Sequence, residues 1–576
     1  MVTVTEGPTL VVCEVTRRGK LLVGEPFFEP GLPLTLGRRG SVPAREGDLV
    51  AVEPAGDRRG RVVEVLGRAR DLPTVIYGIA VDEGIARPWP EEVEEELAAL
   101  PRDPLPMDPG RADLRGRLTF TIDPPDARDF DDAITVEREA GGLRLLVHIA
   151  DVAAFIPVGG PLDIEAERRG CSVYLPGRVE PMIPHPLSSG VCSLQPDVDR
   201  YAVTIDIAPD GEMTAYRSVI RSDHRLSYPQ VERILAGDDP ADPGLLEALS
   251  DARSMAAELR EARFRRGAAR VESREVEFMF DEDGHLVDAD NATEHESHAL
   301  VEELMLLANE RVAQLLDDAR APAIYRVHEA PEPDAVELLV SRLEALDVPT
   351  PPHPKQLSPQ QAAAYVARIS ERVAEYVASS GRGRMTFPTL VLRAMQRARY
   401  SPENLGHSGL ASPAYCHFTS PIRRYPDLVC HRALLAHVGQ ADAAPGDPEV
   451  LQRIAVRSSE RERDAGRIEG RGDDVCLAFL LEHRLYEHGW SEPFAGEITG
   501  LIESALFVQF EEVFDGLLPA RVLGREWFEP DHLGVAMVGR STGRRFRLGD
   551  PVEVTVRSIE RPRGRVLLHR ARDAEP

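Results

Sequence analysis

The stretch that decides the fold of this sequence is Thr121-Ile122-Asp123-Pro124-Pro125-Asp126-Ala127-Arg128-Asp129-Phe130-Asp131-Asp132-Ala133-Ile134. It places five carboxylates within ten residues, directly after the apolar, strand-like segment 118–122. Neighbouring carboxylates raise one another's pKa values, so a folded protein keeps them together only where solvent or a cation separates them. Ligands that are all oxygen suit a hard ion such as Mg²⁺ or Mn²⁺, which leaves coordination positions for water and substrate phosphate. The run therefore predicts a metal-dependent phosphoryl-transfer site.

The spacing within this run limits the alternatives. Asp123 ends the expected strand, and Pro124-Pro125 forces the chain out of the sheet. Three aspartates then return between 129 and 132, and a bend is needed to bring all of them together. A solvated acidic turn is the simplest alternative. An EF-hand calcium loop is a second alternative, but the run lacks the acidic or amide residue, the glycine and the closing glutamate that such a loop requires in register.

Further blocks of the chain occur in the order found in one known protein family. They are Tyr174–Arg178, Pro181–Pro184, Cys192–Leu194, Glu302–Asn309, Tyr325–Glu329, Gly406–Leu410 and Tyr415–Leu428. Together with the acidic run, they resemble the signature of the RNB family of exoribonucleases, which includes ribonuclease II and ribonuclease R. Members of this family hydrolyse single-stranded RNA from the 3′ end and release 5′-nucleoside monophosphates. The resemblance covers roughly residues 115–480, and several ordered motifs make a chance match implausible.

The resemblance implies the chemistry of the site. It suggests a processive 3′-to-5′ exoribonuclease that uses Mg²⁺, with Mn²⁺ as the alternative, in two-metal hydrolysis of a phosphodiester. The metal-holding positions match Asp123, Asp129, Asp131 and Asp132, of which Asp131 and Asp132 are also expected to be catalytic. Asp126 is an extra carboxylate. Arg423 matches the arginine that stabilises charge on the reacting phosphate.

The resemblance also suggests how RNA is held. Tyr174 matches a tyrosine that stacks on the terminal nucleotide, a contact that tolerates any base because every base has a π-face. Further candidates for RNA contact are Arg178, His328, Arg424 and Phe507. A lone histidine or an alternating phenylalanine is also common as a structural residue.

One position departs from the family pattern, and another matches it only loosely. Ribonuclease II has a second clamping aromatic just after a Val-His pair, and the comparable position here is Pro331. Ribonuclease R-like sequences look more like this chain at that point. Glu469 is the nearest match for a family glutamate late in the domain, and the alignment around it is loose.

We expect a multidomain α+β protein in which two OB barrels flank a central domain. Residues 1–75 alternate strand-like runs with turn residues and resemble the family's cold-shock-like OB domain. Residues 76–114 are expected to form a linker with a short acidic helix. Residues 115–487 are expected to form the RNB catalytic domain, a mixed sheet whose helices fall at 244–272, 294–317, 355–400 and 448–487. Residues 488–576 contain five strand-like runs, at 494–498, 505–510, 517–522, 552–558 and 566–568, and resemble a ribosomal S-one-like OB domain that binds RNA.

The aromatic face expected of a cold-shock domain is thin in the N-terminal barrel. Phe27 and Phe28 are the close aromatic pair of the N-terminal barrel, so a structural cap and an RNA clamp are equally supported there. Phe507 and Phe510 are the stacking candidates of the C-terminal barrel.

Composition excludes some classes of protein. The sequence has no apolar stretch of membrane-spanning length, and its start lacks the features of a signal peptide, so we expect a cytoplasmic protein, acting as a monomer without a membrane partner. Six cysteines without any C-x-x-C pair argue against a zinc site or a disulfide framework. The net charge of −28 runs against nucleic-acid binding, but the basic residues are almost all arginine, which grips phosphate well.

We considered three rival functions, of which one stays open. The main alternative is a catalytically silent RNA-binding regulatory protein. A DEDD-type exonuclease would need an early Asp-x-Glu on its first strand, and none is suitably placed. A helicase is disfavoured because no G-x-x-x-x-G-K-[ST] loop occurs. Without such a motor, we expect single strands to be digested readily and digestion to stall near stable RNA duplexes unless a 3′ overhang is supplied.

Overall fold

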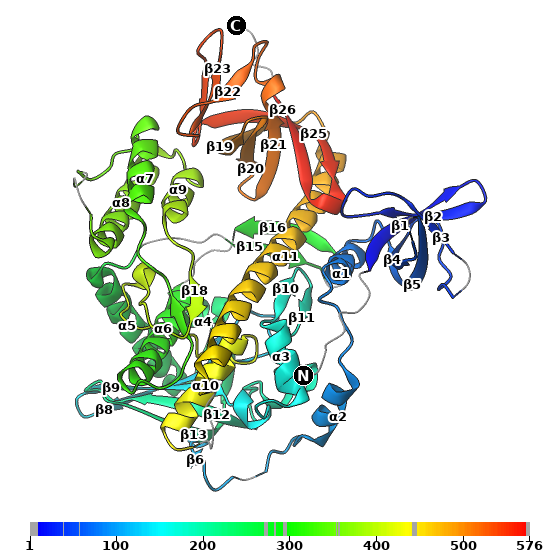
Figure 1. The fold of residues 1–576 in the computed structure, drawn as a ribbon. Coiled ribbons are helices and arrows are strands. Elements are labelled where there is room, and N and C mark those ends of the chain that lie inside the picture. The colour runs from blue at the N-terminus through cyan, green and yellow to red at the C-terminus, as the bar shows by residue number, and fades with distance from the viewer. Residues whose placement is uncertain are drawn as a thin grey trace.

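The computed structural model describes residues 10–37, 40–56, 58–106, 108–269, 275–281, 284–291, 296–352, 354, 357–440 and 446–571. Two small barrels flank a large central domain that contains a mixed sheet and most of the helices (Figure 1). This arrangement confirms the expected multidomain α+β architecture. No helix in the described part of the chain combines the length and apolar character needed to cross a membrane.

The N-terminal barrel is closed, with strand order β1-β2-β3-β5-β4. Its strands are β1 (Val11–Arg18), β2 (Leu21–Pro26), β3 (Leu34–Leu36), β4 (Asp48–Pro54) and β5 (Arg59–Arg68). Four of these coincide with the strand-like runs of the sequence, whereas three-residue β3 was too short to be recognised. Two helices follow, α1 (Leu72–Asp82) and the acidic α2 (Glu91–Ala99), and residue 75, the expected end of the barrel domain, lies within α1.

Phe28 is only 1% exposed and packs in one apolar cluster with α1 and the strand that carries Tyr174. The guanidinium carbon of Arg471 also lies 4.4 Å from the centroid of the Phe28 ring. The aromatic pair of this barrel therefore includes a docking residue. It is not an exposed stacking face.

The central sheet has seven strands in the order β14-β7-β8-β9-β12-β13-β6. They are β6 (Ala112–Asp113), β7 (Phe120–Asp123), β8 (Asp132–Glu139), β9 (Gly142–Ala150), β12 (Asp199–Ile207), β13 (Met213–Arg221) and β14 (His224–Ser227). The two outermost pairs are parallel and the inner pairs are antiparallel. Alternate residues of the strands enter two apolar cores on opposite faces of the sheet, the period of two expected for buried strands.

Helices cover both faces of this sheet. One face packs against α4 (Tyr228–Ala236), α5 (Pro243–Arg266) and α6 (Glu296–Asp318). The other packs against α2, α3 (Pro161–Arg169) and the start of α11 (Pro448–His488), and α10 (Tyr425–His437) contributes to both cores.

Three two-stranded hairpins or ribbons lie beyond the main sheet. They are β10 (Val173–Leu175) with β11 (Arg178–Glu180), β15 (Val276–Phe280) with β16 (Leu286–Asn291), and β17 (Tyr325–Val327) with β18 (Arg399–Ser401). Helices α7 (Pro333–Ala345), α8 (Pro359–Ser380) and α9 (Thr386–Ala394) form a group that shares its core with the C-terminal barrel.

The longest element, α11, runs diagonally through the molecule from the central domain to the C-terminal barrel (Figure 1). Arg471 joins it to α1 through Asp82 and Glu83. At its other end, Arg561 of the C-terminal barrel lies 4.9 Å from the ring centroid of Phe479. Both barrels therefore contact the rest of the molecule through this helix.

The C-terminal barrel is closed by β19 (Phe494–Ile502), β20 (Ala505–Phe510), β21 (Phe514–Pro519), β25 (Pro551–Glu560) and β26 (Arg565–Arg570). The run expected as a strand at 517–522 is shifted, because β21 pairs from Phe514 opposite Phe510, and residues 520–522 form a short 3₁₀ turn instead. A three-stranded sheet, β22 (Phe528–Pro530), β23 (Ala536–Gly539) and β24 (Arg545–Arg547), is an addition that the sequence pattern did not reveal.

Candidate active site

The acidic run lies between two neighbouring strands of the central sheet. β7 ends at Asp123 and β8 begins at Asp132, so these two carboxylates sit at adjacent strand ends. Fully buried Ser193 fixes the loop between them from inside. Its hydroxyl accepts the N–H of Phe130 at 3.0 Å and donates to the carbonyl of Arg128 at 2.8 Å. The bend that the sequence required is thus built by a side chain from the distant Cys192–Leu194 block.

Arg225 holds the same loop from outside. Its guanidinium donates to the carbonyl oxygens of Pro124 and Pro125 at 2.8 and 2.7 Å and lies 5.5 Å from the ring centroid of Phe130. Prolines have no N–H to join a sheet ladder, so this stretch depends on side-chain donors. Arg225 belongs to β14, which pairs in parallel with β7. No sequence signal pointed to this arginine, because only the strand pairing brings it to the loop.

Asp131 is the most deeply placed carboxylate of the run, at 4% exposure. Its Oδ1 accepts the N–H of Ile422 at 2.8 Å, and its Oδ2 lies 3.5 Å from Nε of Arg423. Burial raises the pKa of Asp131 well above its usual value, against the opposing effect of Arg423. Burial also raises the pKa of Asp123 to about 8, with repulsion from Asp132 adding to the shift, and raises the pKa of Asp132 to about 6.

These carboxylates fit a cation. The Oδ2 atoms of Asp123 and Asp131 are buried and have no hydrogen-bond partner among the described residues. A buried carboxylate oxygen without a hydrogen-bond partner costs free energy. A divalent ion would remove that cost, because its positive charge stabilises the ionised carboxylate. Within the described residues, no three His, Cys, Asp or Glu side chains form a ready-made metal cage. Mg²⁺ does not need one, because it is usually held by one or two carboxylates together with water and substrate phosphate.

The two consecutive arginines have different environments. Arg423 has a side chain that is 48% exposed, beside Asp131, and it donates to Oγ of Ser420 at 3.2 Å. Arg424 turns inward and donates to Oδ1 of fully buried Asp427 at 2.7 Å. Arg423 is therefore available to a phosphate at the carboxylates. Arg424, expected as an RNA contact, forms an ion pair at the start of α10.

Tyr174 projects from β10 beside the carboxylates and is 37% exposed. Its hydroxyl donates to Oδ2 of Asp129 at 3.0 Å, and its backbone N–H donates to Oε1 of Glu469 at 2.8 Å. The structure thus brings together Tyr174, Asp129 and Glu469, the glutamate whose alignment was loose. Burial raises the pKa of Glu469, with repulsion from Glu275 contributing and Arg423 opposing the shift.

A second exposed aromatic lies on a neighbouring hairpin. Phe280, at the end of β15, is 38% exposed. A Cβ added to Gly177, in the turn between β10 and β11, would lie 3.8 Å from its ring. Pro331, which occupies the position comparable to the second clamping aromatic of ribonuclease II, is buried. The β15–β16 hairpin was not recognised in the sequence, so Phe280 was missed.

Tyr228 is another neighbour that sequence reasoning missed. It follows directly after Ser227, the strand partner of Asp123, and its ring stacks on His298 with centroids 3.7 Å apart. Burial raises the pKa of Tyr228, and the charges of Asp132 and Asp123 add to the shift. The sequence signal that could have identified Tyr228 is its position directly after the end of a strand.

The remaining RNA-contact candidates lie elsewhere. Arg178 donates to Glu180 at 2.6 Å and stacks 4.3 Å from the ring centroid of Tyr77 on α1. His328 is buried, with Nε2 2.7 Å from the carbonyl of Gln396 and Nδ1 bonded to Ser408 and Gly409. On the C-terminal barrel, Phe507 is 41% exposed, whereas Phe510 is 1% exposed and belongs to the core.

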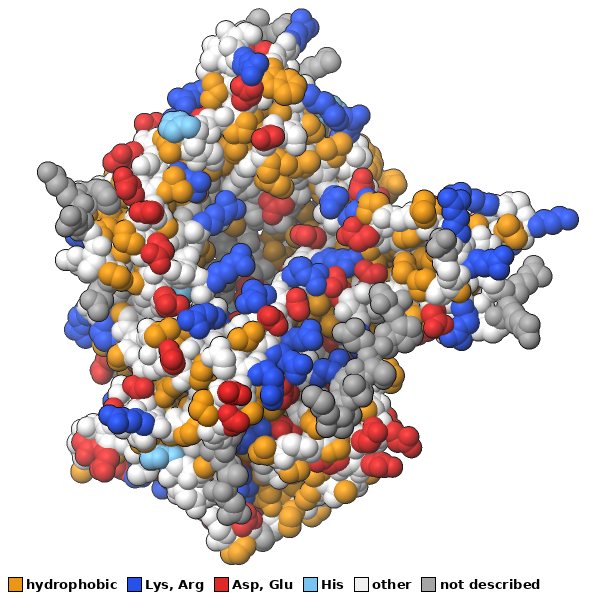
Figure 2. All heavy atoms as spheres, viewed as in Figure 1, with side chains coloured by type: hydrophobic (Ala, Val, Ile, Leu, Met, Phe, Trp, Pro, Cys, Tyr) orange, Lys and Arg blue, Asp and Glu red, His pale blue; other side chains and the backbone are white. Residues whose placement is uncertain are grey.

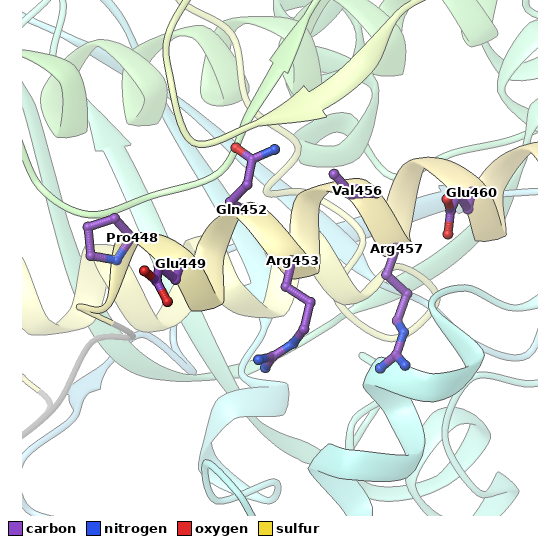
Figure 3. A pocket seen from close by; sticks show the side chains of 7 residues that line it. All are labelled: Pro448, Glu449, Gln452, Arg453, Val456, Arg457 and Glu460. Carbon is purple, nitrogen blue, oxygen red and sulfur yellow. The ribbon is translucent and has the colours of Figure 1, made fainter.

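A shallow depression of about 590 Å³ along the first turns of α11 does not form a second site. Figure 3 shows its side chains spread along one helix, with Arg453 and Arg457 directed to the same side. Both arginines lie near the carboxylate of Glu167 on α3, at 3.8 and 3.0 Å. Their charges are therefore engaged within the protein.

Comparison with known proteins agrees with this geometry. Residues 111–440, more than half of the chain, match the RNB domain. The chain belongs to the RNB family. This membership confirms the resemblance that the ordered motifs indicated.

Two known RNB-family proteins illustrate the relationship. The chain is 36% identical to ribonuclease R of Escherichia coli (strain K12) over 552 residues, which cover 90% of this chain and 65% of that protein. The chain thus spans about two thirds of the length of this relative. Its fold is similar to that of Mycoplasma genitalium RNase R in complex with ribose methylated single-stranded RNA, with a TM-score of 0.86 and 26% identity over 98% of this chain and 90% of that chain. A complex of the same protein with double-stranded RNA gives a TM-score of 0.81 at 26% identity, covering 99% and 97% of the two chains.

Proposed function

We propose that this chain is a processive 3′-to-5′ hydrolytic exoribonuclease that degrades single-stranded RNA to 5′-nucleoside monophosphates with Mg²⁺, or Mn²⁺ in its place. The observation that carries this proposal is the clustering of Asp123 and Asp131 with Asp129 and Asp132, beside exposed Arg423 and Tyr174. Asp123 and Asp131 each have a buried oxygen that lacks a hydrogen-bond partner among the described residues. Membership of the RNB family and similarity to RNA-bound RNase R structures support it.

Each of these residues has a role that follows from its position. A divalent ion at the carboxylates would act as a Lewis acid toward the phosphate oxygens. Arg423 presents fixed donors to the same phosphate, and preorganised charge of this kind stabilises the transition state without reorganisation. Tyr174 offers a stacking surface for the terminal base, and its hydroxyl bond to Asp129 fixes the ring relative to the carboxylates.

The acidic composition is compatible with RNA as substrate. Figure 2 shows arginine and lysine side chains gathered around a hollow between α9 and α11, with acidic side chains interspersed. Local potential, more than net charge, governs what a cleft attracts. We infer that the strand reaches the carboxylates through this hollow, and that the protein acts as a cytoplasmic monomer.

The test is hydrolysis of 5′-end-labelled, unstructured RNA by the purified protein. With Mg²⁺, we expect short labelled products and mononucleotides, and with EDTA, intact RNA. A single-stranded DNA of the same sequence tests the choice of sugar. Tight binding of RNA without hydrolysis in either Mg²⁺ or Mn²⁺ would instead establish the rival function, a catalytically silent RNA-binding regulator.

A further inference from the structure

A cavity of about 1120 Å³ lies where four parts of the chain meet. Its walls come from the start of α1, the β15–β16 hairpin, the second half of α11 and the C-terminal barrel. None of the described lining residues belongs to the candidate active site. The hairpin is a shared wall, because Phe280 faces the turn next to Tyr174 while residues 286–288 line the cavity.

The lining carries more acidic than basic side chains, and it includes three histidines. Of these, His285 lies 3.4 Å from Asp281 and His483 lies 3.5 Å from Glu487. Among the described lining residues, carboxylates outnumber arginines six to two, and the carboxylates are Asp71, Asp281, Asp288, Glu487, Glu492 and Glu511. One of the two arginines, Arg484, is already paired with Asp288 and lies 5.2 Å from the ring centroid of Phe514. A surface of this sign repels phosphate, so RNA is not its natural occupant.

Beside these carboxylates, which we call the rim, the lining also has an apolar part, which we call the floor. Phe514 and Leu485 form a buried floor at 1% exposure each, and half-buried Phe479 and Phe494 continue it. Val287, on the hairpin wall, is 54% exposed. The site therefore offers both ion pairing and apolar contact, the combination found where interfaces bind side chains with cationic heads and apolar anchors.

One rim carboxylate, Glu511, lies in a turn whose backbone is strained and which is tied to the neighbouring hairpin. Glu511 and Glu512 occupy the turn between β20 and β21 with φ values of 49° and 65°, a conformation that non-glycine residues adopt at a cost. The side-chain amide of Asn291 donates to the carbonyl of Glu512 at 3.2 Å and ties this turn to the β15–β16 hairpin.

We propose that this cavity is a docking site for a basic, partly apolar peptide segment of a partner protein. Charge complementarity selects a cationic occupant, and the apolar floor selects one that carries aliphatic side chains between its charges. The volume exceeds the roughly 300–1,000 Å³ of pockets for drug-sized molecules, which favours a stretch of polypeptide over a small cation. The site is independent of the proposed nuclease activity.

The probe is a fluorescein-labelled peptide, Arg-Leu-Arg-Arg-Leu-Arg-Arg, followed by fluorescence anisotropy. We expect saturable binding that weakens with salt, and none for the matched peptide with glutamate in place of arginine. The combined variant Glu487→Gln, Glu492→Gln and Glu511→Gln should bind about tenfold more weakly, because three exposed ion pairs are lost. Its matched control is Glu91→Gln, Glu92→Gln and Glu95→Gln on exposed α2, which should bind like the wild type.

The apolar contribution is tested with Val287→Ser, which should weaken binding severalfold, against Val456→Ser on α11, which is similarly exposed at 47% and should not. Hydrogen exchange should show protection by the peptide at 284–288 and 479–488. An equal loss of binding in the cavity and α2 variants would overturn the proposal. RNA hydrolysis by the cavity variants should stay at the wild-type rate, so this test does not depend on the nuclease assignment.

Discussion

Asp131 places its two carboxylate oxygens in different surroundings. Oδ1 accepts the N–H of Ile422, whereas Oδ2 has no hydrogen-bond partner among the described residues and lies 3.5 Å from Nε of Arg423. Asp131→Asn should therefore keep the fold but remove the charge that a divalent ion needs. We expect hydrolysis to fall to the background level while RNA affinity is unchanged or higher, because a negative charge next to the phosphate is lost. Hydrolysis and binding are measured on the same labelled RNA.

Asp126→Asn is the matched control, because Asp126 belongs to the same run but is exposed. It should hydrolyse RNA like the wild type. Wild-type turnover by Asp131→Asn would remove this residue from the metal site.

Arg423 differs from its neighbour in what it faces, so the pair allows a second residue-level test. Arg423→Ala should lower the single-turnover rate by about 100-fold or more, the usual effect of losing one preorganised charge stabiliser. Arg423→Lys should recover part of the rate, since it restores the charge but not the planar fork. If only the affinity for long RNA falls, Arg423 guides the strand and does not act on the reacting phosphate.

Arg424→Ala provides the contrast. It would leave fully buried Asp427 without its ion pair, which is strongly destabilising. The expected result is a lower melting temperature, a change that Arg423→Ala should not cause.

The raised pKa values of the carboxylates predict how pH affects the metal-free protein. Burial raises the pKa of Asp123 to about 8 and that of Asp132 to about 6, from an unperturbed value of 3.8. Between about pH 4 and pH 8, the folded state therefore binds more protons than the unfolded state, and the free energy of unfolding falls as pH rises. In EDTA, the melting temperature should decrease from pH 6 to pH 8.

Mg²⁺ should reduce this decrease, because the ion stabilises the ionised carboxylates and binds only the folded state. Asp123→Asn should also reduce it in EDTA, since its side chain does not titrate. The same slope in wild type and Asp123→Asn would show that other groups control the pH dependence.

At the level of elements, two hairpins meet beside the carboxylates. The β10–β11 hairpin presents Tyr174 and the β15–β16 hairpin presents Phe280, both partly exposed. Stacking of a base is worth about 1 to 3 kcal/mol, so loss of either ring should loosen the grip on short RNA. Tyr174→Ala should lengthen the final product, and Phe280→Ala should have a similar but separate effect, as read from the end-product ladder on a sequencing gel.

Phe510→Leu, a change in the core of the C-terminal barrel, controls for general destabilisation and should leave the ladder unchanged. An unchanged ladder for Tyr174→Ala would identify this tyrosine as a structural residue.

The same hairpins show what the sequence could and could not predict. Helices such as α5, α6 and α11 were predictable because their apolar residues recur at helical spacing over many turns. The metal site was predictable because its carboxylates lie close together in the sequence. The role of Phe280 depends on a contact between two hairpins about a hundred residues apart, as Arg225 depends on a parallel strand pair. Arg424 and His328 carried motif signals, yet their environments are decided by Asp427 and the backbone of Gln396. Local sequence does not reveal such tertiary partners.

At the level of the whole molecule, both barrels are anchored to helix α11. Arg467 and Arg471 join it to α1, and Arg563 of the C-terminal barrel donates to the carbonyl of Phe28 in the N-terminal barrel at 2.8 Å. The acidic excess of the chain includes the cavity between these parts, where carboxylates outnumber arginines. Around the hollow between α9 and α11, Lys or Arg side chains gather with acidic side chains between them (Figure 2). The two surfaces therefore differ in charge, one mixed and one predominantly acidic.

This architecture leads to a prediction about structured RNA. The proposed site requires one base at a time on Tyr174, with the strand guided past barrels that contact each other through Arg563 and Phe28. We expect thermal fraying and the free energy of successive cleavages to drive strand separation, because the proposed site takes a single strand. We therefore expect single strands to be degraded readily and a blunt, stable hairpin to resist.

The measurement uses hairpin RNAs with identical stems and graded 3′ overhangs in Mg²⁺, with the unpaired strand as control. Short overhangs should be trimmed up to the stem and then stall, since the duplex cannot reach the stacking platform without unpairing. Lowering the stability of the stem by mismatches should move the stall inward, because fraying becomes more frequent. Complete digestion of the blunt hairpin would contradict the prediction. Digestion through the stem only from long overhangs would show that a strand already engaged by Tyr174 and Arg423 is pulled in faster than the duplex can close.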